Sequence, residues 1–215
     1  MRTRFNEELE SLNKEMITLG MLCESAIGKA TDALMSANTD VLEEMPEILE
    51  EVLHIQSKIE SKCIRLLMQQ QPVAQDLRTI SSALKMVTDM ERIGTQSYDV
   101  AEIIGRGEVR LTATRPYFDN MSAAVTKMVT DSIDSFVKKD LELAKLVIEY
   151  DDVVDNCFTP IKQTLIHQLT LSDEESESII DQLMIAKYFE RIGDHAENIA
   201  RWVYYSITGS QYGEA

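Results

Sequence analysis

The sequence TDMERIG, at residues 88–94, returns as KYFERIG at residues 187–193. The two ERIG tetrapeptides lie 99 residues apart in a chain of 215, so the repeat divides the chain into nearly equal halves. Each copy comes late in a segment whose apolar residues recur every three or four positions, as on one face of an α-helix. A glutamate, Glu91 or Glu190, stands in each copy where that pattern predicts an apolar residue. The repeat predicts a duplicated helical fold with these glutamates at its functional centre.

The composition favours a protein made of helices alone. Leu, Ile, Met, Ala, Glu and Lys are abundant, while the chain has only eight glycines and four prolines. Good helix formers with few breakers are typical of all-α proteins. Hydrophobic residues make up 44% of the chain, which is enough for a sizeable core.

The periodic segments predict six long helices, separated by turns. We expect them at residues 4–36, 41–70, 72–104, 114–139, 140–169 and 172–207. Pro46 indicates a separate short turn before the second helix, and Ser172 with Glu175 forms a capping-box pattern before the sixth. Residues 105–116 carry clustered breakers and form the expected linker. The expected fold is all-α, with six long antiparallel helices in two tandem, pseudo-symmetric three-helix bundles at residues 1–107 and 108–215.

The charge and the cysteines limit the function. Lys and Arg total 21 against 37 Asp and Glu, a net charge of −16 that disfavours nucleic-acid binding and docking on anionic lipid. This charge suits a cation or a basic protein partner. Cys23, Cys63 and Cys157 show no disulfide or zinc spacing, and each is expected to be a small core residue. With no apolar signal region and no membrane-span-length segment, the chain is expected to be cytoplasmic and not inserted in a membrane.

Three helices place carboxylates on or beside an apolar stripe. Glu91 continues the stripe of the third helix, and Glu190 continues that of the sixth, with Asp194 one turn further on. In the fifth helix Asp151 lies on the stripe and Asp155 follows one turn later. The stripe residues before the glutamates are Leu77, Ile80, Leu84 and Val87 in the third helix and Ile179, Leu183 and Ala186 in the sixth.

Antiparallel packing of the fifth and sixth helices would bring two carboxylate pairs together. Such a cluster repels itself unless Arg, Lys, protons or bound cations neutralise it. Oxygen ligands suit hard cations such as Mg²⁺, Mn²⁺, Ca²⁺ or ferric iron. The alternative is a solvated pair of acids that bonds to Lys187 or Arg191 at the surface. A weaker motif, Glu51 with His54, has the E-x-x-H spacing of di-iron bundles but lacks the second copy that such a site needs.

Residues 70–94, QQPVAQDLRTISSALKMVTDMERIG, closely resemble the signature of the PhoU family of phosphate-uptake regulators. Residues 189–200, FERIGDHAENIA, resemble the repeat of the same family. The similarity extends over nearly the whole chain, including its length, duplication and linker position. It implies six helices in two three-helix bundles.

The resemblance also implies a function. Members of this family are non-enzymatic cytoplasmic proteins that restrain phosphate uptake and the phosphate-starvation response. They act with the ATPase of the Pst phosphate ABC transporter, and in many bacteria with a membrane sensor histidine kinase. They often dimerise, and they bind metal through E/D-x-x-x-D motifs, so iron, manganese, magnesium and zinc are the candidate cofactors.

The family pattern is complete only in the second half of this chain. The resemblance assigns Asp151, Asp155, Glu190 and Asp194 as metal ligands. In the first half Glu91 is present, but Thr95 replaces the usual aspartate, and Leu49 and Leu53 stand at the expected acid positions. The resemblance therefore predicts one competent metal site in the second half and a weak or absent one, around Glu91, in the first.

Two other functions stay open on the sequence. One is a metal-storage or redox protein built on a carboxylate bundle, which the missing second E-x-x-H disfavours. The other is a purely structural helical scaffold whose carboxylates are solvated. Metal content with and without Glu190 and Asp194 separates them.

Overall fold

The computed structural model describes residues 2–69, 73–107, 109–170 and 176–213. Within these residues the chain is helical, with no strand. The elements are α1 (Arg2–Ser36), the 3₁₀-helix η1 (Asp40–Leu42), α2 (Met45–Gln69), α3 (Ala74–Arg106), α4 (Arg115–Lys138), α5 (Leu141–Leu169) and α6 (Ser176–Thr208). The expected all-α fold of six long helices is confirmed.

The helix ends follow the local signals in the sequence. The separate turn expected before Pro46 is η1. Asp140 caps α5, because its side chain accepts a hydrogen bond from the backbone N–H of Leu143 at 3.0 Å. The capping box of Ser172 and Glu175 lies outside the described residues.

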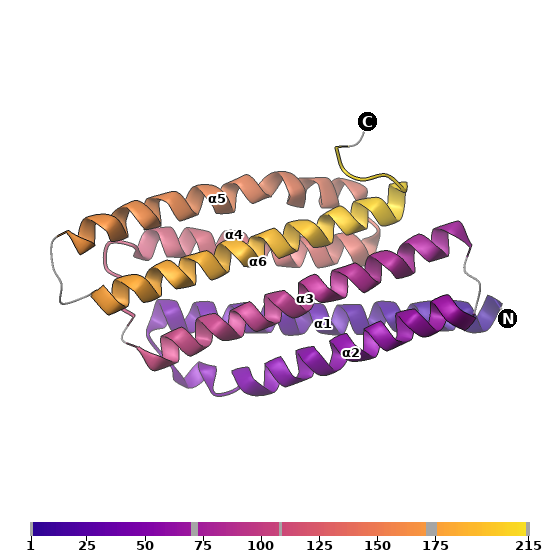
Figure 1. Ribbon diagram of the computed structural model, residues 1–215, viewed down its shortest axis with the longest axis horizontal. Helices are drawn as coiled ribbons and strands as arrows, with labels where there is room; N and C mark the ends of the chain where they lie inside the picture. The colour runs from indigo at the N-terminus through magenta and orange to yellow at the C-terminus, as the bar shows by residue number, and fades with distance from the viewer. Residues whose placement is uncertain (1, 70–72, 108, 171–175, 214–215) are drawn as a thin grey trace.

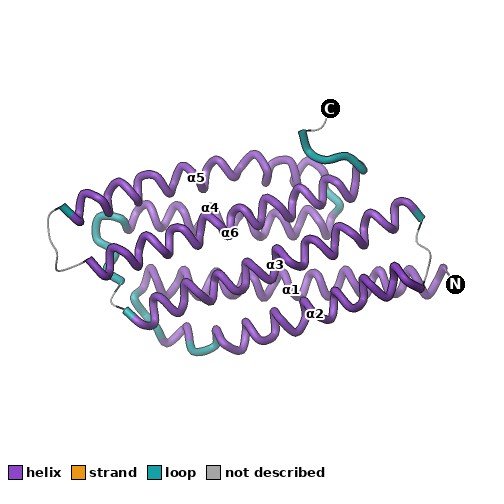
Figure 2. The backbone as a smooth tube through the Cα atoms, viewed as in Figure 1, coloured by secondary structure: helices purple, strands orange, loops and turns teal. Residues whose placement is uncertain are grey.

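The six helices form two groups of three that lie side by side along the long axis of the molecule (Figure 1). α1, α2 and α3 pack on one another, as do α4, α5 and α6. The two groups meet where α3 lies along α6 and α1 along α4. Consecutive helices in each group run in opposite directions (Figure 2). The division into a domain of residues 1–107 and a domain of residues 108–215 stays a prediction.

One hydrophobic core runs through both halves. Buried residues from all six long helices belong to it, among them Leu12, Ile59 and Phe189. Cys23 and Cys63 are buried in this core, as expected, and burial raises the pKa of each thiol to about 12. Cys157, which was also expected in the core, is only partly buried and packs against it. At Gly20 in α1, a Cβ atom would lie 2.8 Å from Ile133 of α4, so the small residue allows these helices to approach closely.

A polar seam crosses the core between α3 and α6. The amide nitrogen of Gln96 lies 3.2 Å from His195 Nε2, and His195 Nδ1 lies 2.9 Å from Asp89 Oδ1. Because the Asp89 carboxylate only accepts, Nδ1 carries the proton and Nε2 accepts from Gln96. Tyr188 of α6 also hydrogen-bonds to Asp99 of α3. The seam therefore joins the two halves through bonds that depend on the relative position of the two helices.

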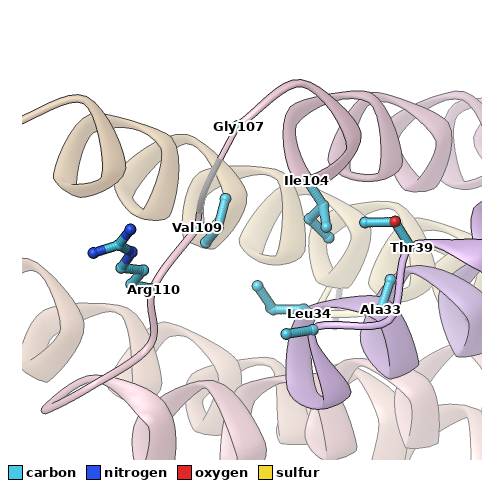
Figure 3. A pocket seen from close by; sticks show the side chains of 8 residues that line it. Ala33, Leu34, Thr39, Ile104, Gly107, Val109 and Arg110 are labelled. Carbon is cyan, nitrogen blue, oxygen red and sulfur yellow. The ribbon is translucent and has the colours of Figure 1, made fainter.

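A cavity of about 380 Å³ lies near the C-terminal ends of α1 and α3 (Figure 3). Its walls are mainly apolar, and the side chain of Arg110 extends away from Leu34 and Thr39. No predicted site residue lines it. Across the described residues, no helix has the length and apolar character needed to cross a membrane.

Candidate metal centre

The two ERIG copies lie at equivalent places in their halves. A Cβ atom at Gly94 would lie 2.9 Å from Val52 of α2, and one at Gly193 would lie 3.3 Å from Val154 of α5. Glycine therefore permits the close approach of a neighbouring helix in both halves. Val52 and Val154 are thus equivalent.

This equivalence aligns α2 with α5. Counting three residues back and one residue forward from each valine, Leu49 takes the position of Asp151 and Leu53 that of Asp155. The register expected from the sequence for the two leucines agrees with this packing.

The acids of the second half lie across the α5–α6 contact. Asp151 is close to α6, because a Cβ atom at Gly193 would lie 3.7 Å from Asp151 Oδ1. Burial, together with the negative charges of Glu197, Asp155 and Asp194, raises the pKa of Asp151 to about 7. The carboxylates of the two helices therefore share one electrostatic environment.

The pKa values of the other two aspartates are also raised. The loss of part of its hydration raises the pKa of Asp155, and the charge of Glu190 adds to the effect. The pKa of Asp194 is raised by the same two causes, with a contribution from Asp155. Asp155 and Asp194 nevertheless lie at the solvent-exposed rim, whereas Asp151 is half-buried.

The expected core-facing position of the glutamates is confirmed only in part. The side chains of Glu91 and Glu190 are half-buried, with 16% and 18% of their surface exposed. Leu77 and Leu183, which were expected in the same stripes, are exposed. α3 and α6 each pack against several helices, so their buried faces are wide and centred elsewhere, and the glutamates lie at the edge of the core.

One acid of the cluster has an internal cation as its partner. Lys187, over the ring of Phe158, forms an ion pair with Glu190. This is the surface pairing that the sequence offered as the alternative to a metal. As the side chains stand, no three His, Cys, Asp or Glu residues within the described ranges are arranged to hold one metal ion.

One carboxylate oxygen of the cluster is nevertheless suited to bind a cation. Asp151 Oδ1 is buried and has no hydrogen-bond partner in the protein. A buried carboxylate oxygen without a donor is costly, and a hard cation would satisfy it. Oxygen donors from two facing helices are the chemistry that iron, manganese and magnesium accept in proteins.

Sequence reasoning missed a fifth acid, Glu197. It lies three residues after Asp194 on the same face of α6, and it is the charged group that most raises the pKa of Asp151. Arg201 holds it through Nε and Nη2, which donate to Glu197 Oε1 at 2.9 and 2.6 Å. The i, i+3 spacing from Asp194 was the available signal.

Among the described residues of the first half, no comparable cluster surrounds Glu91. Thr95 donates to Glu91 Oε1 at 2.8 Å, and Arg92 Nε lies 3.4 Å from Glu91 Oε2. Glu91 is therefore already satisfied, and the acids that would complete its site are leucines. Glu51 and His54 are both exposed on α2. His195 lies in the polar seam between the halves.

Known proteins resemble this chain over nearly its full length. Residues 16–104 and 118–203 match the PhoU domain family. The phosphate-specific transport system accessory protein PhoU homolog of Clostridium acetobutylicum is 34% identical over 98% of this chain and 97% of its own length. The accessory protein PhoU of Escherichia coli is 26% identical over 97% of this chain and 87% of its own.

A solved structure gives the same result for the fold. The crystal structure of PhoU from Pseudomonas aeruginosa superposes with a TM-score of 0.91 and 31% identity, covering 96% of this chain and all of that one. Two matched segments, one in each half, account for the repeated ERIG sequence. The chain belongs to the PhoU domain family.

Proposed function

We propose that this protein is a non-enzymatic negative regulator of phosphate uptake and of the phosphate-starvation response, acting on the ATPase of a Pst phosphate transporter. The end-to-end match to accessory proteins of phosphate-specific transport systems carries this proposal. A cytoplasmic location follows from the role, because the ATPase of an ABC transporter works in the cytoplasm. A membrane sensor histidine kinase is the second partner we propose, and a homodimer is the proposed assembly.

We further propose a metal site on α5 and α6, formed by Asp151, Asp155, Glu190 and Asp194. The unpartnered Asp151 Oδ1, beside acids with raised pKa values, supports it. A bound iron, manganese, magnesium or zinc ion would neutralise the cluster and join the two helices. Glu91 is at most a weak ligand, because Thr95 and Arg92 already occupy its oxygens.

Deletion of the gene and co-purification test the regulatory role together. We expect loss of the protein to release phosphate uptake from control in high phosphate, and the tagged chain to retain the transporter ATPase. A chain with Asp134→Asn, which changes an exposed acid of α4, should restore control as the wild type does. Unaltered phosphate control in the deletion strain would refute the proposal.

Elemental analysis of protein purified without chelator tests the metal site. We expect metal in the wild-type chain and in Asp134→Asn, and its loss in the double variant Glu190→Ala, Asp194→Ala. Circular dichroism should show that the double variant stays helical. Equal metal content in all three chains would contradict the metal site and would indicate that the carboxylates are solvated surface groups.

A further inference from the structure

The end of the chain folds back on the α5–α6 hairpin. Gly209 has a φ of +83°, which turns the backbone after α6, and the segment then bends towards the start of α5 (Figure 1). Tyr212 is the anchor of this segment. Its ring packs edge-on against Tyr204 at 5.3 Å, and its hydroxyl donates to Glu149 Oε1 of α5 at 3.2 Å. The contacts link the tail to both helices of the candidate metal centre.

Tyr212 also covers Arg201. The Arg201 Cζ atom lies 5.7 Å from the centre of the Tyr212 ring, which is cation–π distance. The guanidinium also makes two bonds to one oxygen of Glu197. An aromatic ring and a carboxylate therefore both hold Arg201. A chain of direct contacts leads from the tail to an acid of the cluster.

We propose that Tyr212 positions Arg201 as an internal counter-ion of Glu197. Glu197 is then a fifth carboxylate of the α5–α6 cation site, and it becomes available to a cation when Tyr212 releases Arg201. This inference rests on the metal site proposed above. Lys187 has the same relation to Glu190 on the other side of Asp194, so an internal cation holds a glutamate on each side of that aspartate. Of these two cations, Tyr212 packs against Arg201.

The consequence is competition between arginine and metal. A positive guanidinium at Glu197 repels an incoming cation and occupies an oxygen that would otherwise bind it. Loosening Arg201 should therefore raise cation affinity. An arginine–carboxylate pair as exposed as this one has a modest energy, which corresponds to about a twofold to fivefold change in affinity.

Titration with Mn²⁺ by calorimetry, on the full chain, tests the counter-ion role. We expect Tyr212→Ala and Arg201→Gln each to bind Mn²⁺ about twofold to fivefold more tightly than the wild type. Tyr212→Phe keeps the ring over Arg201 and should stay close to the wild type. In the background Glu197→Gln, adding Tyr212→Ala should change nothing, because the carboxylate that Arg201 masks is gone.

The single tryptophan gives an independent reading of the tail. Trp202 lines a small pocket of about 140 Å³ together with Arg201, Gln211 and Tyr212. Saturating Mn²⁺ should shift its emission maximum in the wild type towards the value of metal-free Tyr212→Ala. The wavelength is the measure, because a paramagnetic ion also quenches intensity.

The outcomes separate the two proposals. Equal Mn²⁺ affinity in the wild type, Tyr212→Ala and Arg201→Gln would overturn the counter-ion role and leave the metal site intact. A Tyr212→Ala effect that persists with Glu197→Gln would overturn the part given to Glu197. Absence of Mn²⁺ binding in every chain would reject the metal site itself, and this inference with it.

Discussion

Gly94 and Gly28 show that the effect of one added carbon atom depends on how closely another helix approaches. At Gly94 a Cβ atom would lie 2.9 Å from Val52, a buried and branched side chain with little freedom to move. At Gly28, an exposed position inside α1, a Cβ atom would meet nothing within 4 Å. The same substitution therefore has opposite consequences at the two positions.

We expect Gly94→Ala to lower the free energy of unfolding by about 1–3 kcal/mol, because the overpacked contact outweighs the gain in helix propensity. Gly28→Ala, the matched control, should raise it by about 0.5–1 kcal/mol. Urea denaturation followed by circular dichroism measures both. A stabilised Gly94→Ala would mean that α2 moves away from α3 at little cost.

Asp151 makes stability depend on pH. Its pKa is raised from 3.8 to about 7 in the folded chain, so the folded state holds an extra proton between these values. The free energy of unfolding then falls as pH rises through this window and stays low above it. Because the side chain is only half-buried, we expect about 1–2 kcal/mol from this group.

Asp151→Asn should remove this part of the pH dependence. In the presence of chelator, the variant should melt higher than the wild type at about pH 8 and close to it at about pH 4. A weaker slope remains, because Asp155 and Asp194 also have raised pKa values. If the two chains keep the same difference in melting temperature at every pH, folding does not raise the pKa of Asp151.

At the scale of the elements, α3 and α6 hold the halves together through the polar seam. His195 hydrogen-bonds to Asp89 and to Gln96 at once. Alanine at this position would leave both side chains without this partner. We expect His195→Ala to cost about 1–2 kcal/mol of unfolding free energy. A double-mutant cycle with Gln96→Ala should show coupling, whereas His54→Ala, exposed on α2, should change little.

The alignment of α2 with α5 predicts how to give the first half a metal site. Leu49, Leu53 and Thr95 stand where the second half has Asp151, Asp155 and Asp194, and Leu53 is already 45% exposed. The triple variant Leu49→Asp, Leu53→Asp, Thr95→Asp should bind about one further equivalent of metal, beyond the second-half site. Elemental analysis against Thr95→Asp alone checks it, and equal metal content in both would contradict the alignment.

For the whole molecule, the net charge of −16 matters more than any single pair. The exposed carboxylates repel one another, and dissolved salt screens that repulsion. We expect the melting temperature of the metal-free protein to rise between about 0.01 M and about 0.3 M NaCl, where the screening length falls below about 10 Å. Choline chloride should raise the melting temperature by the same amount, because screening depends on ionic strength. A difference between the two salts would indicate specific Na⁺ binding.

The sequence by itself determined the helices, their order and the family. Apolar periodicity, caps such as Asp140 and breakers such as Gly107 act within a few residues of the chain, so they can be recognised without knowing any partner. The apolar stripes singled out the four acids of α5 and α6, and the family resemblance indicated the loss of their counterparts in α2 and α3. Leu49 and Leu53 could be identified because duplication supplies an internal comparison.

Only the tertiary structure decided how these residues are used. The rotation of α6 against several neighbours placed Glu190 at the edge of the core and exposed Leu183. Packing of α3 on α6 joined His195 to Asp89, two residues that lie in different halves. The fold of the tail brought Tyr212 onto Arg201 and thereby linked it to Glu197. A helical pattern fixes which residues share a face, but the partner of each face depends on how the helices pack.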